Sequence, residues 1–250
     1  MAVQSDIALI DELVRLRAEL RRREREAADK ELQLQRYAAD LRETFKQERA
    51  RAQELRRSYM ATVRALSNAV EARDAYTGKH AERVAAYGLV IARRFAPELE
   101  ITPELEFGYL LHDVGKVAIP DAILYKPSSL DPDERALMAR HPVIGAEIVR
   151  GIEFLAEAAA VVRSHHERWD GTGYPDGLAG EEIPLAARVF SAADVLDALT
   201  TDRPYRPACS LPYARAMITA ERGTQFDPRV VDAFNSIDDE VFERIAAEIR

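Results

Sequence analysis

The stretch HDVGK, residues 112–116, follows the apolar segment LEFGYLL and precedes a turn. It sets the imidazole of His112 beside the carboxylate of Asp113, with Lys116 three residues further on. Imidazoles and carboxylates are ligands of divalent transition metals, so this pair either helps to hold a metal ion or lies on a surface. Adjacent residues on a helix point about 100° apart, so both can serve one site only near a helix end or in a wide cluster.

The composition is typical of one soluble domain of ordinary size with a further segment attached: 250 residues, 47% hydrophobic and 31% charged. The single cysteine, Cys209, excludes an internal disulfide and favours a cytoplasmic location. No apolar run approaches the roughly 18 residues of a membrane-spanning helix, and the N-terminus lacks the layout of a secretion signal. The net charge of −8 argues against direct binding of DNA or RNA and against anionic membranes.

Residues 1–77 contain neither glycine nor proline and therefore favour helix. Apolar residues recur there at spacings of three and four, interrupted by Arg23, Lys30 and Glu48. This imperfect heptad pattern predicts a parallel dimeric coiled coil, with a charged signalling helix over 1–58 as the first domain. A single solvated helix is the alternative, although a lone exposed helix of this length would have nothing to pack on. The predicted seam comprises Leu9, Leu13, Leu16, Leu20, Ala27, Leu34, Tyr37, Leu41 and Leu55.

The second predicted domain, residues 59–250, shows helix after helix and no sustained alternation of period two, so the predicted fold class is all-α. Thr77 is expected to cap a helix over 80–95, Thr102 to open one that reaches Asp113 and stops at Gly115, and Asp131 with Glu134 to form a capping box. Further helices are predicted over 143–150, 154–167, 185–199, 212–222, 228–235 and 239–249. The glycine- and proline-rich segment 168–184 is expected to be a functional loop.

All five histidines lie in this second domain, on or at the ends of four predicted helices. A single histidine on a helix is more often a core or surface residue than a ligand. Several helices can nevertheless each lend side chains to a shared interior metal site. The residues alone therefore indicate a plausible helical metal site.

Several motifs together resemble the HD-GYP family, the branch of the HD phosphohydrolases that hydrolyses cyclic di-GMP. The matching pieces are EARDAYTGKHAERV (71–84), LLHDVGKVAIPDAIL (110–124), the HP of MARHPVIGAEI (138–148), HHERWDGTGYPDGLAGEEIPLAARVFSAADVLDALTTDRPYRPA (165–208) and GTQFDP (223–228). The resemblance covers roughly 58–240 and implies an HD-domain helical bundle with a C-terminal helical extension and a GYP loop.

The resemblance also implies a site with two divalent metal ions, iron or manganese. Asp113 would bridge the two ions, and the implied ligands are His80, His112, Asp113, His141, His165, His166 and Asp194. His141, His165 and His166 would complete one ion, and His112, Asp194 and His80 would serve the other. Some members add a glutamate four residues before the first ligand histidine and bind a third metal. Here that position is Tyr76, so a dinuclear site is expected.

For the reaction, the resemblance implies that a metal-bridging hydroxide attacks phosphorus in line and releases linear pGpG, with a possible second cut to GMP. Lys116 would contact the scissile phosphate, Arg203 and Arg206 would hold phosphates of the dinucleotide, and Tyr174 would shape the substrate site. Structural roles are the alternatives: Lys116 as a helix cap, the two arginines paired to Asp202 or Asp197, and Tyr174 in a tight turn. Asp197 and Asp202 are interpreted as supporting residues rather than ligands, and Glu167 and Trp169 as residues that stabilise the loop.

Two other functions compete with a cyclic di-GMP phosphodiesterase. One is a catalytically weak module that senses the dinucleotide, and the other is a phosphodiesterase for another cyclic dinucleotide such as cyclic GMP-AMP. The expected partners are cyclic di-GMP, a second copy of the chain through the N-terminal helix, an upstream sensory protein, and GGDEF-type proteins at the GYP loop. Because the first domain is all helix, the input signal is expected from a separate protein or from a domain outside this chain.

Overall fold

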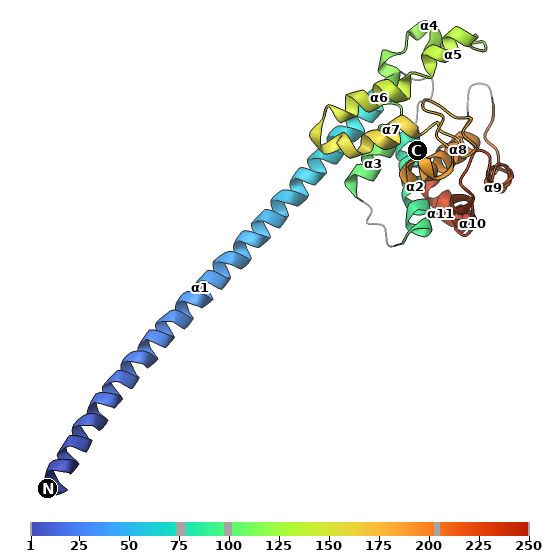
Figure 1. Ribbon diagram of the computed structural model, residues 1–250. Helices are drawn as coiled ribbons and strands as arrows, with labels where there is room; N and C mark the ends of the chain where they lie inside the picture. Colours follow the sequence, from blue (N-terminus) through green and yellow to red (C-terminus); the bar gives the residue numbers. More distant parts are fainter. Residues whose placement is uncertain (1, 74–78, 98–101, 203–205, 250) are drawn as a thin grey trace. The chain divides into compact units, whose positions relative to one another are not determined.

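The computed structural model describes residues 2–73, 79–97, 102–202 and 206–249, and the chain divides into two compact units, 1–58 and 59–250. The regular elements are shown in Figure 1 and follow in chain order. They are α1 (Ala2–Glu71), α2 (His80–Phe95), α3 (Pro103–Leu110), η1 (Val114–Ala118), α4 (Asp121–Leu124), α5 (Pro132–Met138), α6 (His141–Arg150), η2 (Glu153–Ala158), α7 (Ala159–Ser164), η3 (Gly180–Glu182), α8 (Leu185–Thr200), α9 (Leu211–Ala220), α10 (Pro228–Asn235) and α11 (Asp239–Glu248).

The predicted all-α fold is confirmed, since the described residues contain no β-strand. The extended pairing that does occur consists of two isolated bridges, Asp170 with Ala179 and Arg222 with Phe226. The predicted capping box is also present, because the Asp131 carboxylate accepts from the backbone N–H of Glu134 and the Glu134 carboxylate accepts from that of Asp131. None of the described helices is both long and apolar enough to cross a membrane.

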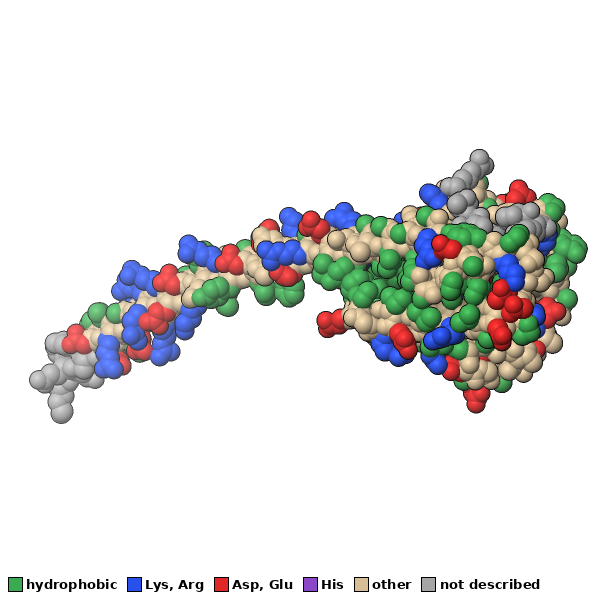
Figure 2. Space-filling model, turned by 90° about the horizontal axis from the view of Figure 1, so that it is seen from above, with side chains coloured by type: hydrophobic (Ala, Val, Ile, Leu, Met, Phe, Trp, Pro, Cys, Tyr) green, Lys and Arg blue, Asp and Glu red, His purple; other side chains and the backbone are tan. Residues whose placement is uncertain are grey.

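The described residues of the first unit belong to α1, and their large apolar side chains, described from Ile10 onward, are exposed. Leu34 is 67% exposed and Leu20 57%, so these seam positions find no partner within the described part of the chain. Figure 2 shows acidic and basic side chains interspersed along this segment, with hydrophobic side chains between them. Ion pairs one helical turn apart, such as Arg23 with Glu19 at 2.9 Å, lie on its surface and support the helix only weakly.

The second unit is built around α2 and α8, which pack along each other at its centre. Val84 and Ile91 of α2, and Phe190 and Leu196 of α8, are fully buried. Residues 59–71 of α1 belong to this unit and complete its core: Val63 is 1% exposed, and the Tyr59 ring stacks on Phe154 with centroids 4.1 Å apart. The packed pair of α2 and α8 thus carries candidate site residues on a buried core, His80 at the start of α2 and Asp194 within α8.

Two predicted helices are shorter than expected, and both differences fall at histidines. The helix expected to run to Asp113 ends at Leu110, and His112 and Asp113 lie in the turn that follows. This turn leads into η1, whose Gly115 lies against the main chain of α6, and that contact takes the chain off the axis of α3. The helix expected over 154–167 is divided into η2 and α7 and ends at Ser164, because the backbone N–H of Glu167 turns back to the Ser164 carbonyl. The Thr77 cap lies outside the described residues.

Candidate metal centre

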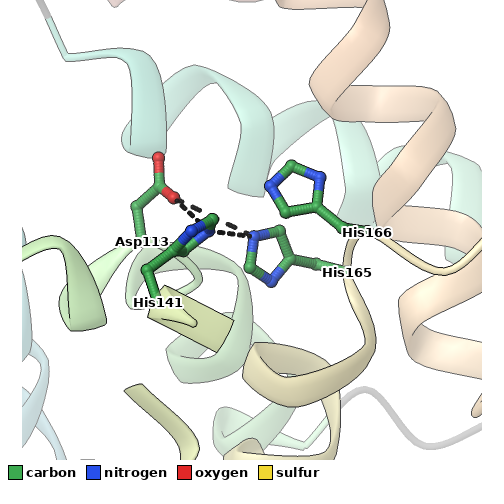
Figure 3. Close-up of side chains that lie close together, drawn as sticks. All are labelled: Asp113, His141, His165 and His166. Carbon is green, nitrogen blue, oxygen red and sulfur yellow. Dashed lines mark hydrogen bonds and ion pairs between the residues drawn. The ribbon is translucent and has the colours of Figure 1, made fainter. Parts of the chain in front are cut away.

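A first group of ligand atoms comes from three separate segments. Asp113, His141, His165 and His166 each offer one atom, and these atoms all lie within 4.8 Å of one another. Asp113 sits in the turn before η1, His141 is the first residue of α6, and the two adjacent histidines follow α7 (Figure 3). The His141 and His165 Nε2 atoms are 3.2 Å apart, and His141 Nε2 is 3.2 Å from Asp113 Oδ1.

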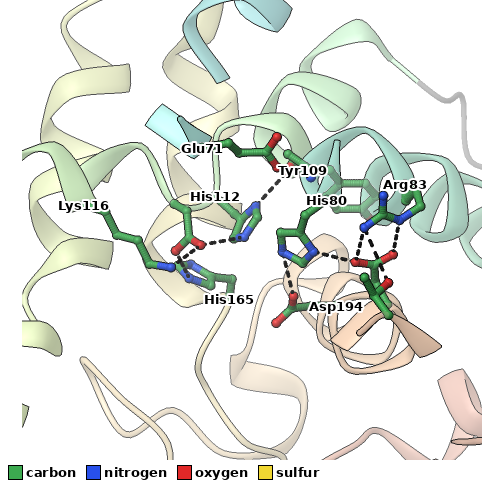
Figure 4. A network of polar contacts seen from close by, with 12 residues as sticks. Glu71, His80, Arg83, Tyr109, His112, Lys116, His165 and Asp194 are labelled. Atoms are coloured by element: carbon green, nitrogen blue, oxygen red, sulfur yellow. Dashed lines mark hydrogen bonds and ion pairs between the residues drawn. The ribbon is translucent and has the colours of Figure 1, made fainter. Parts of the chain in front are cut away.

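A second group consists of His80, His112 and Asp194, again with ligand atoms within 4.8 Å of one another. His80 begins α2 and Asp194 lies on α8, so the central helix pair carries two members of this group, and His112 comes from the turn after α3 (Figure 4). His80 Nε2 is 3.3 Å from Asp194 Oδ1, and the His80 and His112 rings meet edge to face with centroids 5.4 Å apart.

Asp113 faces both groups through different oxygens. Its Oδ1 is directed to His141 of the first group, while its Oδ2 lies 3.2 Å from His112 Nε2 of the second. One carboxylate can therefore serve two neighbouring ions, one through each oxygen. His112 and Asp113 are adjacent in the sequence and both lie in the turn after α3. The turn directs the His112 side chain to the second group and the Asp113 side chain to the position between the two groups.

The approach of Asp113 to His141 depends on a contact between two stretches of main chain. A Cβ placed on Gly115 would lie 1.9 Å from the carbonyl oxygen of His141 and 2.6 Å from the backbone nitrogen of Gly145. No side chain fits there, so glycine lets η1 lie directly on the first turn of α6. The glycine of HDVGK is therefore a structural requirement of the metal centre.

The pKa values of three ligand histidines are shifted, in opposite directions in the two groups. Burial lowers the pKa of His165 well below its usual range and that of His166 to about 4, with neighbouring imidazoles adding to the effect. For His80, burial acts in the lowering direction, but hydrogen bonds to Asp194 and Asp197 outweigh it and raise the pKa to about 10. For Asp113, burial would raise the pKa, yet Lys116 and His112 hold it well below its usual range. In the absence of metal, His165 and His166 are therefore neutral imidazoles, whereas His80 is an imidazolium cation.

The residue types fit divalent transition ions. Two clusters of imidazole nitrogens and carboxylate oxygens, without thiolate, make up a donor set suited to iron or manganese rather than to a structural zinc site. His112, His141 and His165 are buried, so their nitrogens do not face bulk water. The two groups could each hold one ion.

The GYP loop, which contains Gly173, Tyr174 and Pro175, is held beside the metal centre by hydrogen bonds to Glu167 and by a ring contact of Tyr174. Glu167, which is 3% exposed, accepts from the backbone N–H groups of Asp176 and Leu178 at 2.8 and 3.1 Å, so the predicted stabilising role of this residue is confirmed. The Tyr174 ring stacks on His166 with centroids 4.7 Å apart, and the peptide bond from Tyr174 to Pro175 is cis. A cavity of about 250 Å³ lies beside the loop, lined by His166, Tyr174 and Asp194 among others.

Of the residues expected to bind phosphate, Lys116 lies within the metal centre and Arg206 contacts α8 instead. Lys116 Nζ lies 2.8 Å from Asp113 Oδ2, within the metal centre. Arg206 donates to the carbonyl oxygen of Ala198 on α8, and the structure brings its guanidinium to none of the ligand carboxylates. Arg203 lies outside the described residues, as do Tyr76 and Asp74, which bear on the expected absence of a third metal.

Sequence reasoning did not find two supporting contacts. Glu71, at the end of α1, accepts from the backbone N–H of Ala81 and so caps the helix that begins with His80. Arg83 forms a forked ion pair with Asp197, the carboxylate that contacts His80 Nδ1. The signal for this pair is visible in the sequence after the fact, because Arg83 and Asp197 each follow a candidate ligand, His80 and Asp194, by three residues.

Comparisons with known proteins agree with this architecture. Residues 64–230 match the model of the HD domain family. The cyclic di-GMP phosphodiesterase response regulator RpfG of Xanthomonas campestris pv. campestris is 45% identical over 174 residues, which are 69% of this chain and 46% of that protein. The 3′3′-cGAMP-specific phosphodiesterase 2 of Vibrio cholerae is 39% identical over 181 residues, or 72% of this chain and 35% of that protein. The chain thus spans less than half the length of these two relatives.

Among solved structures, a cyclic GMP-AMP specific phosphodiesterase of V. cholerae, V-cGAP3, superimposes with a TM-score of 0.54 at 22% identity. The superposition covers 74% of this chain and 52% of the other. At this identity the likeness concerns the fold alone.

Proposed function

The chain belongs to the HD domain family, and from this premise we propose that it is a metal-dependent phosphodiesterase of the HD-GYP branch that hydrolyses cyclic di-GMP to linear pGpG. The observation that carries the proposal is the position of Asp113, one oxygen toward His141 and the other toward His112. With one ligand group on either side, this carboxylate could contact both ions of a two-metal site. Two relatives are named as phosphodiesterases of cyclic di-GMP and of 3′3′-cGAMP, which supports a cyclic dinucleotide as the substrate.

The seven proposed ligands are His80, His112, Asp113, His141, His165, His166 and Asp194. Two divalent ions held here, iron or manganese in our proposal, would supply a deprotonated water as nucleophile and stabilise the attacking and leaving oxygens. The chain's own contribution is to fix the ligands: the carboxylate of Asp113 is held by Lys116 and the imidazoles on both sides, so its geometry is set before a substrate binds.

Lys116 is proposed to bind the scissile phosphate. Its ammonium group lies against Asp113, and its side chain is 20% exposed, so Lys116 is close to the proposed ion positions and also accessible to a ligand. A cation at this place would offset the charge that develops on the phosphate oxygens in the transition state. Arg203 and Arg206 remain proposed contacts for phosphates of the dinucleotide. Tyr174 is proposed to line the substrate site because its ring stacks on the His166 imidazole.

A second candidate substrate is 3′3′-cGAMP, since relatives of both specificities match this chain. The test is hydrolysis of each dinucleotide by protein purified without oxygen and loaded with iron or manganese, beside an Asp113→Asn variant. We expect linear product from the parent and none from the variant. Asp227→Asn is the control, because Asp227 is a buried carboxylate, 2% exposed and paired to Arg188 at 2.8 Å, outside the metal centre. Binding of dinucleotide without turnover by fully loaded parent protein would identify a sensor and contradict the proposal.

We further propose that the enzyme forms a homodimer through the exposed seam of the first unit, and that a sensory protein acts upstream. GGDEF-type proteins are proposed to bind at the GYP loop. A cytoplasmic location, expected from the single cysteine, stays part of this proposal.

A further inference from the structure

The ligand imidazoles are oriented by two different kinds of acceptor. Three of them direct Nδ1 to the main-chain carbonyl oxygen three residues earlier, at 3.0, 2.8 and 2.7 Å: His112 to Tyr109, His141 to Met138 and His165 to Val162. A carbonyl oxygen only accepts, so Nδ1 carries the hydrogen and Nε2 is left for a metal ion. His80 is oriented otherwise, with Nδ1 2.7 Å from the carboxylate oxygen Oδ2 of Asp197.

The Asp197 carboxylate is held rigidly. It is 1% exposed, and its Oδ1 accepts from Arg83 Nε at 2.6 Å while its Oδ2 accepts from Arg83 Nη2 at 3.1 Å. Arg83 is itself 8% exposed. Burying an ion pair costs desolvation free energy, and apolar residues of similar volume packed between α2 and α8 would stabilise the protein as much or more. The presence of this ion pair directly behind one ligand therefore calls for a role other than stability.

We propose that Asp197 is a positioning residue for the His80, His112 and Asp194 group, holding His80 so that Nε2 faces Asp194, with Arg83 fixing the carboxylate in place. This inference rests on the proposed two-metal function. A charged acceptor also makes the imidazole a stronger donor to a metal than a carbonyl does. The two ion positions are consequently unequal: the second depends, at His80, on a buried side-chain pair, whereas His141 and His165 of the first are oriented by main-chain carbonyls.

The test is the binding of Mn²⁺ alone to the metal-free full-length protein, measured by calorimetry and by metal content after dialysis. In Asp197→Asn, which keeps the shape but removes the charge, we expect one of two Mn²⁺ ions to bind 10- to 100-fold more weakly and the other to bind as in the parent. Arg83→Lys keeps a cation but loses the fork, so it should weaken the same ion to a smaller extent. This second variant also serves if Asp197→Asn does not fold.

Asp227→Asn is the matched control, because it removes the charge of a buried carboxylate paired to arginine away from the ligands. It should leave both ions unchanged. If Asp197→Asn binds both ions like the parent, or weakens both equally, the positioning role is overturned. If the parent itself does not take up two ions, the two-metal function fails instead, so the two failures are distinguishable.

Discussion

Replacing Gly115 by alanine tests whether the contact between η1 and α6 sets the position of the metal ligands. The new Cβ would lie 1.9 Å from the carbonyl oxygen of His141, whereas real Cβ contacts stay beyond 3.0 Å, so the two segments must separate by roughly 1.1 Å. The clashing atoms belong to the main chain, so no side-chain rotation can relieve the overlap. Asp113 precedes Gly115 by two residues, and the displaced carbonyl belongs to a ligand residue.

Overpacking of this kind costs about 1–3 kcal/mol of folding free energy, and a misplacement of about 1 Å at a reacting centre lowers the rate about 100-fold. We expect Gly115→Ala to remain folded, to unfold at lower urea concentration and to lose about two orders of magnitude in kcat/KM for cyclic di-GMP, with reduced metal content. Urea unfolding, metal analysis and steady-state kinetics measure the three effects.

Gly151→Ala is the control, because it lies just past the other end of α6, where the nearest atom to a new Cβ is 3.4 Å away. It should change neither activity nor metal content. Full activity and unchanged metal content in Gly115→Ala, or a structure of that variant in which η1 and α6 have not separated, would refute the reasoning.

Three further predictions follow from the loop, the seam and the buried histidines. Glu167→Gln replaces one acceptor by an amide donor, so it should cost about 1.5–3 kcal/mol and speed hydrogen exchange in the GYP loop; unchanged exchange would contradict this. Leu34→Glu on the seam should shift the protein from dimer to monomer in analytical ultracentrifugation, whereas Leu32→Glu, equally apolar but off the seam, should not; a dimer in both variants would exclude the seam as the interface. In metal-free protein, the lowered pKa of His166 should make stability fall as pH drops from 6.5 toward 4, and the raised pKa of His80 should make stability fall as pH rises from 6.5 toward 10. Urea unfolding should therefore show a maximum near pH 6.5, and stability that keeps rising above pH 7 would show that His80 is not held as described.

The fold class could be predicted because helix signals are local. The absence of glycine and proline before Gly78 predicts helix, and the structure has one from Ala2 to Glu71. The capping box of Asp131 was readable for the same reason, since its two partners are three residues apart.

The convergence of the ligands was expected only from the family resemblance, because side chains far apart in the sequence, such as Asp113 and His165, carry no local sign of their proximity. The helix end at Leu110 was missed because a tertiary contact follows it, the close approach of Gly115 to α6. The end at Ser164 was missed because the local turn from Glu167 back to Ser164, which contains the two histidines, was not recognised in the sequence. The pair of Arg83 and Asp197 was likewise hidden, since it joins α2 to α8 across 114 residues of sequence.

The carbonyl acceptors of His112, His141 and His165 have a consequence for the evolution of this site. Every amino acid supplies the same carbonyl, so no point mutation at Tyr109, Met138 or Val162 can delete these three acceptors as long as the helical turn persists. The orientation of these imidazoles is thus robust to sequence drift. His80 has no such protection, and a single codon change at Asp197 removes its acceptor. Loss of the proposed activity in descendants of this protein should therefore begin there more often than at the other three.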